Sequence, residues 1–157
     1  MTRLHIPVAL RWSDFDAYGH VNNAEMLRVL EEARMQAFWR SEHPEEDLPT
    51  AVLEGGPSPE VLSLISRQEI EYLAPIPYAR RPLDIELWIG RLGGASLELC
   101  YEVFSPFGVE PRRLYTRAAT TLVMVSAVAG MPTRIPAAYR AAWEPYLEPA
   151  IEIAHRG

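Results

Sequence analysis

The chain has 157 residues, of which 48% are apolar and 23% are charged, a composition typical of one globular domain. Its formal net charge of −6 argues against nucleic acid as the main partner, because phosphate binding requires a basic surface. The single cysteine, Cys100, cannot form an internal disulfide, and no stretch has the roughly 18 consecutive apolar residues of a membrane span. The first residues, MTRLHIPVALRW, lack the apolar run of a signal peptide. We therefore expect one domain over residues 1–157, cytoplasmic and without membrane association.

Two periodicities alternate in the first part of the chain. Apolar residues alternate over residues 4–12, which predicts a strand, and a helical period follows from Asn23 to about Arg40. The apolar stripe of this expected helix contains Met26, Leu30, Ala33 and Ala37. Residues 41–60 are rich in proline, glycine and acids and predict a long loop, which is either a lid or binding loop or a disordered connection.

The second half of the chain returns to a period of two. Strands are predicted over residues 61–73, 82–92, 93–104 and 114–127, and a short helix begins at Pro136. The expected buried faces of the second and third of these strands carry Leu83, Ile85, Leu87 and Ile89, and Leu97, Leu99, Tyr101 and Val103. This element order predicts an α+β fold in which an antiparallel sheet packs on one main helix.

The first of these four strands carries two polar residues, Ser66 and Gln68, on an otherwise apolar face. The other members of that face are Leu62, Leu64, Ile70 and Tyr72. Polar groups on an apolar face need hydrogen-bond partners, so the two residues either line a pocket or satisfy each other. Glu69 and Glu71 share the opposite face with Arg67, which predicts ion pairing between them.

The most informative stretch is SDFDAYGHVNN, residues 13–23, directly before the expected helix. Its acids and asparagines are ordinary helix caps, and Gly19 supplies a backbone conformation that other residues avoid. The same parts also suit acyl chemistry. Free N–H groups at a helix start can stabilise an oxyanion, and a nearby carboxylate can attack a carbonyl or take a proton from water.

The sequence DFDAYGHVNNAEMLRVLEEAR resembles the signature of the hotdog-fold acyl-CoA thioesterases, in the 4-hydroxybenzoyl-CoA thioesterase-like branch. The strand–helix–four-strand order is the hotdog order, and TRIPAAYR near the end resembles the family's tail. The resemblance implies an antiparallel sheet wrapped around one long central helix and hydrolysis of an acyl-CoA without a cofactor. It also implies a homodimer or homotetramer with the site at the subunit boundary.

Site residues follow from the resemblance position by position. Asp16 takes the place of the catalytic carboxylate, as nucleophile or as general base, and the sequence leaves this choice open. The backbone N–H near Asn23 corresponds to the oxyanion donor. Gly19 and His20 shape the turn, and Asn22 orients the turn or the attacking water. Asp14 is expected to support this stretch locally.

Substrate-binding residues are expected at three places in addition to Ser66 and Gln68. Met26 stands where many members carry a tyrosine, which makes the acyl pocket more apolar. Arg80 and Arg81 either hold coenzyme A phosphates by charge-assisted bonds or form a solvated basic turn. Arg112–Arg113 is a second candidate for the same role.

Several alternatives remain open at this point. Glu31 and Glu32 lie off the apolar stripe of the helix and are interpreted as surface charges. The histidines His5, His43 and His155 lack ligand spacing, so we expect no metal site. An acyl-carrier-protein thioesterase and a non-catalytic acyl-CoA-binding protein are the rival functions. The negative net charge disfavours an acidic carrier unless Arg80 and Arg81 form a basic patch.

Overall fold

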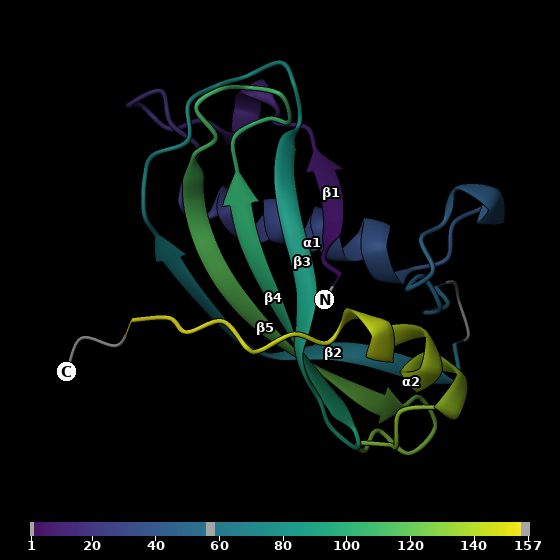
Figure 1. Ribbon diagram of the computed structural model, residues 1–157. Coiled ribbons are helices and arrows are strands. Elements are labelled where there is room, and N and C mark those ends of the chain that lie inside the picture. Colours follow the sequence, from purple (N-terminus) through teal and green to yellow (C-terminus); the bar gives the residue numbers. More distant parts are fainter. Residues whose placement is uncertain (1, 56–58, 155–157) are drawn as a thin grey trace.

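The computed structural model describes residues 2–55 and 59–154, and its centre is a five-stranded antiparallel sheet (Figure 1). The strands are β1 (Leu4–Val8), β2 (Val61–Tyr72), β3 (Leu83–Leu92), β4 (Ser96–Phe104) and β5 (Leu114–Ser126). Their order across the sheet is β1-β3-β4-β5-β2, so β1 and β2 are the two edges. The long helix α1 (Glu25–Phe38) lies behind the sheet in Figure 1, which is the hotdog arrangement that was predicted.

The remaining elements are short. Helix α2 (Ala137–Trp143) follows β5, and single 3-10 turns occur at Trp12–Asp14, Pro44–Glu46 and Glu144–Tyr146. The predicted loop over residues 41–60 has no α-helix or named strand in its described part, and residues 56–58 lie outside the described residues. No helix in the described part of the chain is long and apolar enough to cross a membrane.

Helix α1 forms the core with the inner face of the sheet, as its periodicity predicts. Met26, Leu30, Ala33 and Ala37 are all buried, together with Val29 and Phe38. The two predicted inner faces of β3 and β4 are also buried in full. Burying one such side chain contributes roughly 1.5–3 kcal/mol, so this face of the helix holds it against the sheet.

The first strand is shorter than predicted and ends at Val8 instead of residue 12. Val8 pairs with Leu83, the first residue of β3, and the preceding Pro82 has no N–H to continue the ladder. Beyond this point the Asp14 carboxylate accepts the Arg11 N–H at 2.7 Å and closes a 3-10 turn. Trp12 therefore lies on the surface, with 78% of its area exposed.

A β-bulge in β2 overturns the expectation of one continuous apolar face. Ile65 pairs with Leu122 and Arg67 with Thr121, so Ser66 is the extra residue. An extra residue reverses the faces beyond it, because side chains alternate with a period of two. Ile70 and Tyr72 thus lie on the inner face, whereas Leu62 and Leu64 lie on the outer face. The predicted ion pairing around Glu69 and Glu71 is confirmed, through Arg67 and Arg117.

The C-terminal segment crosses the outer face of the sheet (Figure 1). The Glu148 N–H donates to the Ile89 carbonyl at 3.0 Å, and Trp88 Nε1 donates to the Pro149 carbonyl at 3.1 Å. Gly90 is required for this approach, since a Cβ there would lie 2.9 Å from Ala150 Cα. The segment therefore covers part of the sheet surface that would otherwise face solvent.

Candidate active site

Asp16 opens a tight turn between β1 and α1. Its carbonyl accepts the Gly19 N–H at 3.1 Å, and Gly19 has a φ of 77°, a conformation that favours glycine. The Asp16 carboxylate accepts the N–H groups of Tyr18 at 2.8 Å and His20 at 3.3 Å, both through Oδ1. Within the described residues its Oδ2 has no donor. This half-buried carboxylate is thus held in one orientation with one oxygen available.

Asn22 and Asn23 lie in the turn directly before α1. The Asn22 side chain accepts the Ala24 N–H at 2.9 Å, and its carbonyl accepts the Met26 N–H at 3.2 Å. The Asn22 side chain therefore stabilises the turn ahead of α1, whose N-cap residue is Ala24. The Asn23 N–H finds no acceptor in the described part of the chain. Asn23 lies two residues before the first residue of α1, close to the positive end of the helix dipole, where an anion is stabilised.

These groups meet in one cleft of about 380 Å³, here named the Asp16 cleft. Its lining comprises Asp16, His20, Val21, Asn23, Met26, Tyr72, Leu73, Ala74, Pro75, Ile76 and Thr116. Four of the ten residues predicted for the site thus line it. Gly19 and Asn22 lie in the adjoining segment between Asp16 and α1. Ser66, Gln68, Arg80 and Arg81 do not line this cleft in a single chain.

The loop after β2 supplies the residues that sequence reasoning missed. The Val21 N–H donates to the Ile76 carbonyl at 3.0 Å, which ties this loop to the Asp16 turn. The Tyr72 hydroxyl donates to the Asn23 carbonyl at 2.8 Å, and burial raises the pKa of this phenol. Tyr72 therefore remains a donor at neutral pH. The only available signal in the sequence was that Tyr72 shares a predicted strand face with Ser66 and Gln68.

Asp14 has a different environment from Asp16, although only one residue separates them. Its side chain is fully buried, and its carboxylate pairs with Arg11 at 3.1 Å and with Arg28 at 2.7 Å. Burial alone would raise the pKa of Asp14, but hydrogen bonds and charge from these two arginines outweigh it and lower the pKa. Asp14 therefore anchors the turn to α1, in agreement with its expected supporting role.

The helix also contains a buried charge that the sequence did not reveal. Arg34 is 5% exposed, and its Nη1 donates to the Tyr101 hydroxyl at 3.3 Å. Glu31 lies at the margin of ion pairing with Arg34, 4.0 Å from its Nη2, and is itself exposed, as predicted. Nearby, Thr120 donates to the Gln68 side chain at 3.4 Å. Gln68 is thus satisfied by Thr120 on the neighbouring strand, and not by Ser66 as the second alternative for these two residues required.

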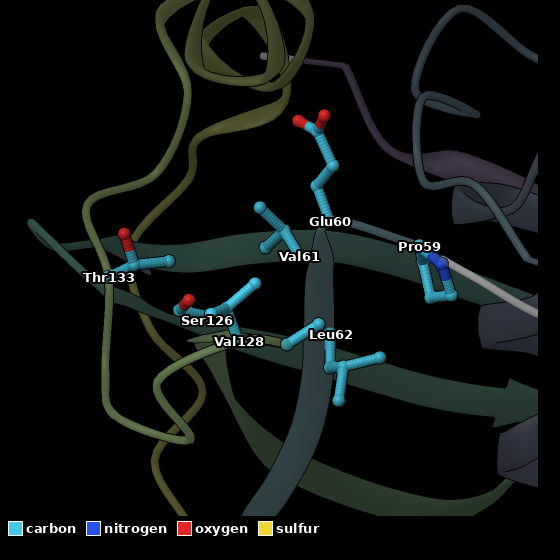
Figure 2. A pocket seen from close by; sticks show the side chains of 8 residues that line it. Pro59, Glu60, Val61, Leu62, Ser126, Val128 and Thr133 are labelled. Atoms are coloured by element: carbon cyan, nitrogen blue, oxygen red, sulfur yellow. The ribbon is translucent and has the colours of Figure 1, made fainter.

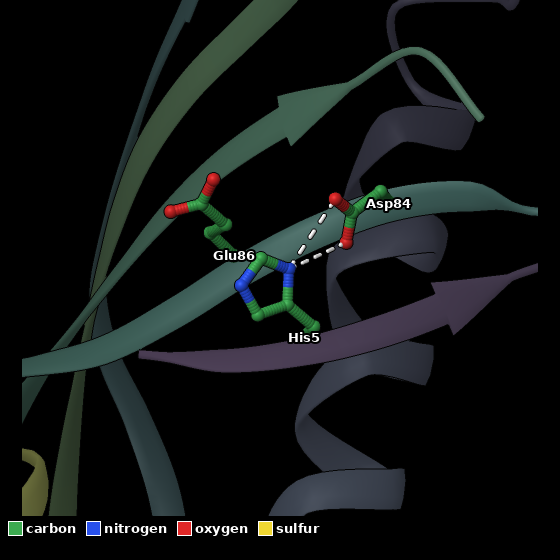
Figure 3. A group of neighbouring side chains, drawn as sticks. All are labelled: His5, Asp84 and Glu86. Atoms are coloured by element: carbon green, nitrogen blue, oxygen red, sulfur yellow. Dashed lines mark hydrogen bonds and ion pairs between the residues drawn. The ribbon is translucent and has the colours of Figure 1, made fainter. Parts of the chain in front are cut away.

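Figure 3 shows His5, Asp84 and Glu86 gathered on the outer face of β1 and β3. Three such side chains could hold a metal ion, but their carboxylates already accept hydrogen bonds. Arg112 Nη2 lies 3.0 Å from Asp84 and 2.6 Å from Glu86, and His5 Nδ1 lies 3.0 Å from Asp84. The group is therefore an ion-pair network. His155, which was also considered as a metal ligand, lies outside the described residues.

A larger cavity of about 800 Å³ lies at the opposite end of β2 (Figure 2). Its lining comprises Pro59, Glu60, Val61, Leu62, Ser126, Ala127, Val128 and Thr133. Glu60 is the one ionisable side chain among them, so this cavity lacks the convergent polar groups of a reaction centre. The Asp16 cleft is smaller but carries the carboxylate, the imidazole and the helix start.

Comparison with known proteins identifies the family. The model of the thioesterase-like superfamily matches residues 10–143 of this chain. The chain belongs to the thioesterase-like superfamily. The match covers the residues of the Asp16 cleft, and it is to the superfamily as a whole and not to the 4-hydroxybenzoyl-CoA thioesterase-like branch. Among proteins with curated descriptions, none matches the sequence.

Solved structures of similar proteins agree with this family assignment. The PA2801 protein of Pseudomonas aeruginosa, a thioesterase by assignment, shares 30% identity over 90% of this chain and 98% of its own, with a TM-score of 0.68. A Thermus thermophilus thioesterase complexed with coenzyme A and zinc shares 25% identity over 90% and 92%, with a TM-score of 0.66. The PA5185 protein of P. aeruginosa, at 24% identity, covers 94% of both chains with a TM-score of 0.72.

Proposed function

We propose that this protein hydrolyses acyl-CoA thioesters in the Asp16 cleft. One observation carries the proposal: Asp16, whose Oδ2 has no donor among the described residues, and Asn23, whose backbone N–H has no acceptor among them, line the same cleft. Membership in the thioesterase-like superfamily supports thioester hydrolysis, and the Thermus relative complexed with coenzyme A supports this class of substrate.

The cleft supports two routes, and we retain both. In one, Asp16 Oδ2 attacks the thioester carbon, the thiolate leaves, and water then cleaves the resulting anhydride. In the other, Asp16 takes a proton from water while that water attacks the same carbon. In both routes the Asn23 N–H stabilises the oxyanion, and the products are a free acid and coenzyme A.

The acyl group is proposed to occupy the apolar part of the cleft. Met26 is 1% exposed and Ile76 is 3% exposed, and Leu73 lies at the mouth with 47% of its area exposed. A tyrosine at position 26 would place a hydroxyl here, whereas the methionine leaves this wall without a polar atom other than sulfur. We therefore propose an apolar acyl group.

Turnover on a panel of acyl-CoAs tests the proposal, with wild type beside Asp16→Asn and Glu32→Gln. Loss of a general base or nucleophile lowers kcat by roughly 10²–10⁴-fold, so Asp16→Asn should lose almost all turnover. Glu32 is an exposed acid on α1 that lies outside the cleft, and Glu32→Gln should remain within about twofold of wild type. Equal rates for wild type and Asp16→Asn would refute the role of Asp16.

We also propose that two copies pair through β2. This edge strand leaves its backbone open, and exposed edges are normally paired or protected. Ile65 lies on the inner face of β2, yet 41% of its area is exposed because no described part of the single chain covers it. Antiparallel pairing about a two-fold axis would bring the Val61 end of one β2 beside the Tyr72 end of the other. The Figure 2 cavity of one copy would then adjoin the Asp16 cleft of its partner.

A further inference from the structure

Two arginine pairs that are far apart in the sequence meet at one corner of the sheet. Arg80–Arg81 lie in the loop between β2 and β3, and Arg112–Arg113 lie in the loop between β4 and β5. The loops adjoin there, since a Cβ at Gly108 would lie 3.9 Å from Arg81 Nη1. Arg112 pairs with Asp84 and Glu86, so the positive charge left at this corner comes from Arg80, Arg81 and Arg113, which have no ion-pair partner among the described residues.

A cavity of about 260 Å³ lies at this corner and is here named the outer cavity. Its lining comprises His5, Pro7, Arg81, Pro82, Leu83, Asp84 and Phe107. None of these residues lines the Asp16 cleft, so the outer cavity is a separate feature of the fold. The side chains of His5 and Asp84 form one wall, on the outer face of the sheet (Figure 3).

The outer cavity combines an apolar ring surface with a cation. The Phe107 ring is 84% exposed, a large apolar area to leave in water. Arg81 is exposed and has no ion-pair partner among residues 2–55 and 59–154. The Asp84 carboxylate is held in place by His5 and Arg112, and it can accept a further hydrogen bond.

We propose that the outer cavity binds an adenine nucleotide. The planar base would lie against Phe107 and the two prolines, with its exocyclic amine directed to Asp84. The phosphates would pair with Arg81 and the neighbouring Arg80 through charge-assisted bonds. A flexible acyl chain would leave Arg80 and Arg81 without an anionic partner, and a bare phosphate would leave the Phe107 ring uncovered.

The nucleotide bound in the outer cavity could come from either of two sources. Ile76 lines the Asp16 cleft and Arg81 lines the outer cavity, and five residues of chain span at most about 18 Å. The nucleotide end of a bound coenzyme A thioester could therefore reach this cavity through its pantetheine arm, a source that rests on the proposed function. A free adenine nucleotide is the other source and does not depend on it.

Calorimetric titration with adenosine 3′,5′-bisphosphate tests the shared chemistry. Wild type should bind the bisphosphate, and Arg81→Gln and Phe107→Ala should each weaken binding by about tenfold, the worth of one charge-assisted bond or aromatic contact. Arg40→Gln is the control, because Arg40 is another exposed arginine, near the end of α1 and outside the outer cavity, and binding to this variant should equal binding to wild type. Arg81 and Phe107 are both exposed, so the melting curves of their variants should match that of wild type.

Three results would overturn the proposal. These are no bisphosphate binding by wild type, equal binding by wild type and both cavity variants, and inorganic phosphate binding as tightly as the bisphosphate. The last result would show that the base contributes nothing.

Kinetics with Arg81→Gln then distinguishes the two sources. A raised KM for an acyl-CoA, with unchanged hydrolysis of the corresponding acyl-pantetheine, assigns the outer cavity to the nucleotide end of the substrate. An unchanged KM together with weakened bisphosphate binding assigns it to a free nucleotide. If wild type hydrolyses no acyl-CoA, the proposed function fails, whereas the titration still decides the nucleotide site.

Discussion

Asp14→Asn removes a buried negative charge that two arginines share. The Asp14 carboxylate accepts the Arg11 N–H at 2.7 Å, Arg11 Nη2 at 3.1 Å and Arg28 Nη2 at 2.7 Å. These bonds connect the turn that contains Asp16 to the first turns of α1. We therefore expect the variant to fold with lower stability.

The cost follows from what each arginine loses. Breaking a buried ion pair from one side costs roughly 3–5 kcal/mol, because the remaining charge is left uncompensated. The Arg28 side chain is 23% exposed and bears most of this loss, whereas the Arg11 side chain is 56% exposed and is screened by water. Asparagine retains the size of the side chain and one acceptor oxygen. The expected loss is about 2–3 kcal/mol in the free energy of unfolding at pH 7.

The pH dependence gives the prediction a second, independent readout. The pKa of Asp14 is lowered in the folded protein, so its stabilisation is fully present above the unfolded pKa of about 3.9. It is lost as the pH falls through the lower, folded pKa. The difference between wild type and Asp14→Asn should therefore be constant from pH 7 to about pH 5 and shrink below about pH 4.

Urea unfolding followed by tryptophan fluorescence measures both quantities, at one fixed protein concentration. Glu54→Gln is the control, because Glu54 is 65% exposed and its one ion-pair partner among the described residues is the exposed Arg40. Exposed pairs contribute about 0–1 kcal/mol, so this variant should unfold close to wild type. A loss below about 0.5 kcal/mol for Asp14→Asn, or a loss that persists unchanged to pH 3, would refute this account of the ion pairs.

Two further substitutions test the packing and the edge of the sheet. Gly90→Ala would place a Cβ 2.7 Å from Cys100 Sγ and 2.9 Å from Ala150 Cα, so it should cost about 1–3 kcal/mol and speed proteolysis of the C-terminal segment. Wild-type stability with an intact segment would contradict that close contact. Ile65→Lys should convert a dimer to a monomer in light scattering, because each buried Ile65 contributes roughly 1.5–3 kcal/mol. A dimer that persists in Ile65→Lys, or a monomeric wild type, would contradict pairing through β2.

Sequence periodicity predicted those parts of the fold in which one face of an element is buried along its whole length. The stripe of α1 and the inner faces of β3 and β4 are of this kind. The end of β1 and the faces of β2 were predicted wrongly, because both depend on a partner strand. The end of β1 is set by Pro82, the residue before β3, which has no N–H to extend the ladder. The bulge at Ser66 exists only in the pairing of β2 with β5. Neither partner is visible in the periodicity of the strand itself.

The same distinction applies to the site. Asp16, His20, Asn23 and Met26 are close in sequence, and local turn and cap geometry brings them to one cleft. The opposite wall of that cleft contains Tyr72, Ile76 and Thr116. These residues come from distant segments, and they meet the turn only because β2 pairs with β5 at the edge of the sheet. The two arginine pairs likewise converge through strand order, which no spacing in the sequence expresses.

In the DFD sequence, Asp14 makes the contacts that hold the turn, and this leaves the Asp16 carboxylate with few partners. The charge of Asp14 is neutralised by Arg11 and Arg28, and its backbone carbonyl accepts the Asn22 N–H at 2.8 Å. These contacts fix both ends of the turn, so the Asp16 carboxylate is not needed to join the turn to the helix. Only two backbone N–H groups hold it, both through Oδ1. Oδ2 of Asp16, without a donor in the described chain, is therefore the carboxylate oxygen of this motif that can meet a substrate.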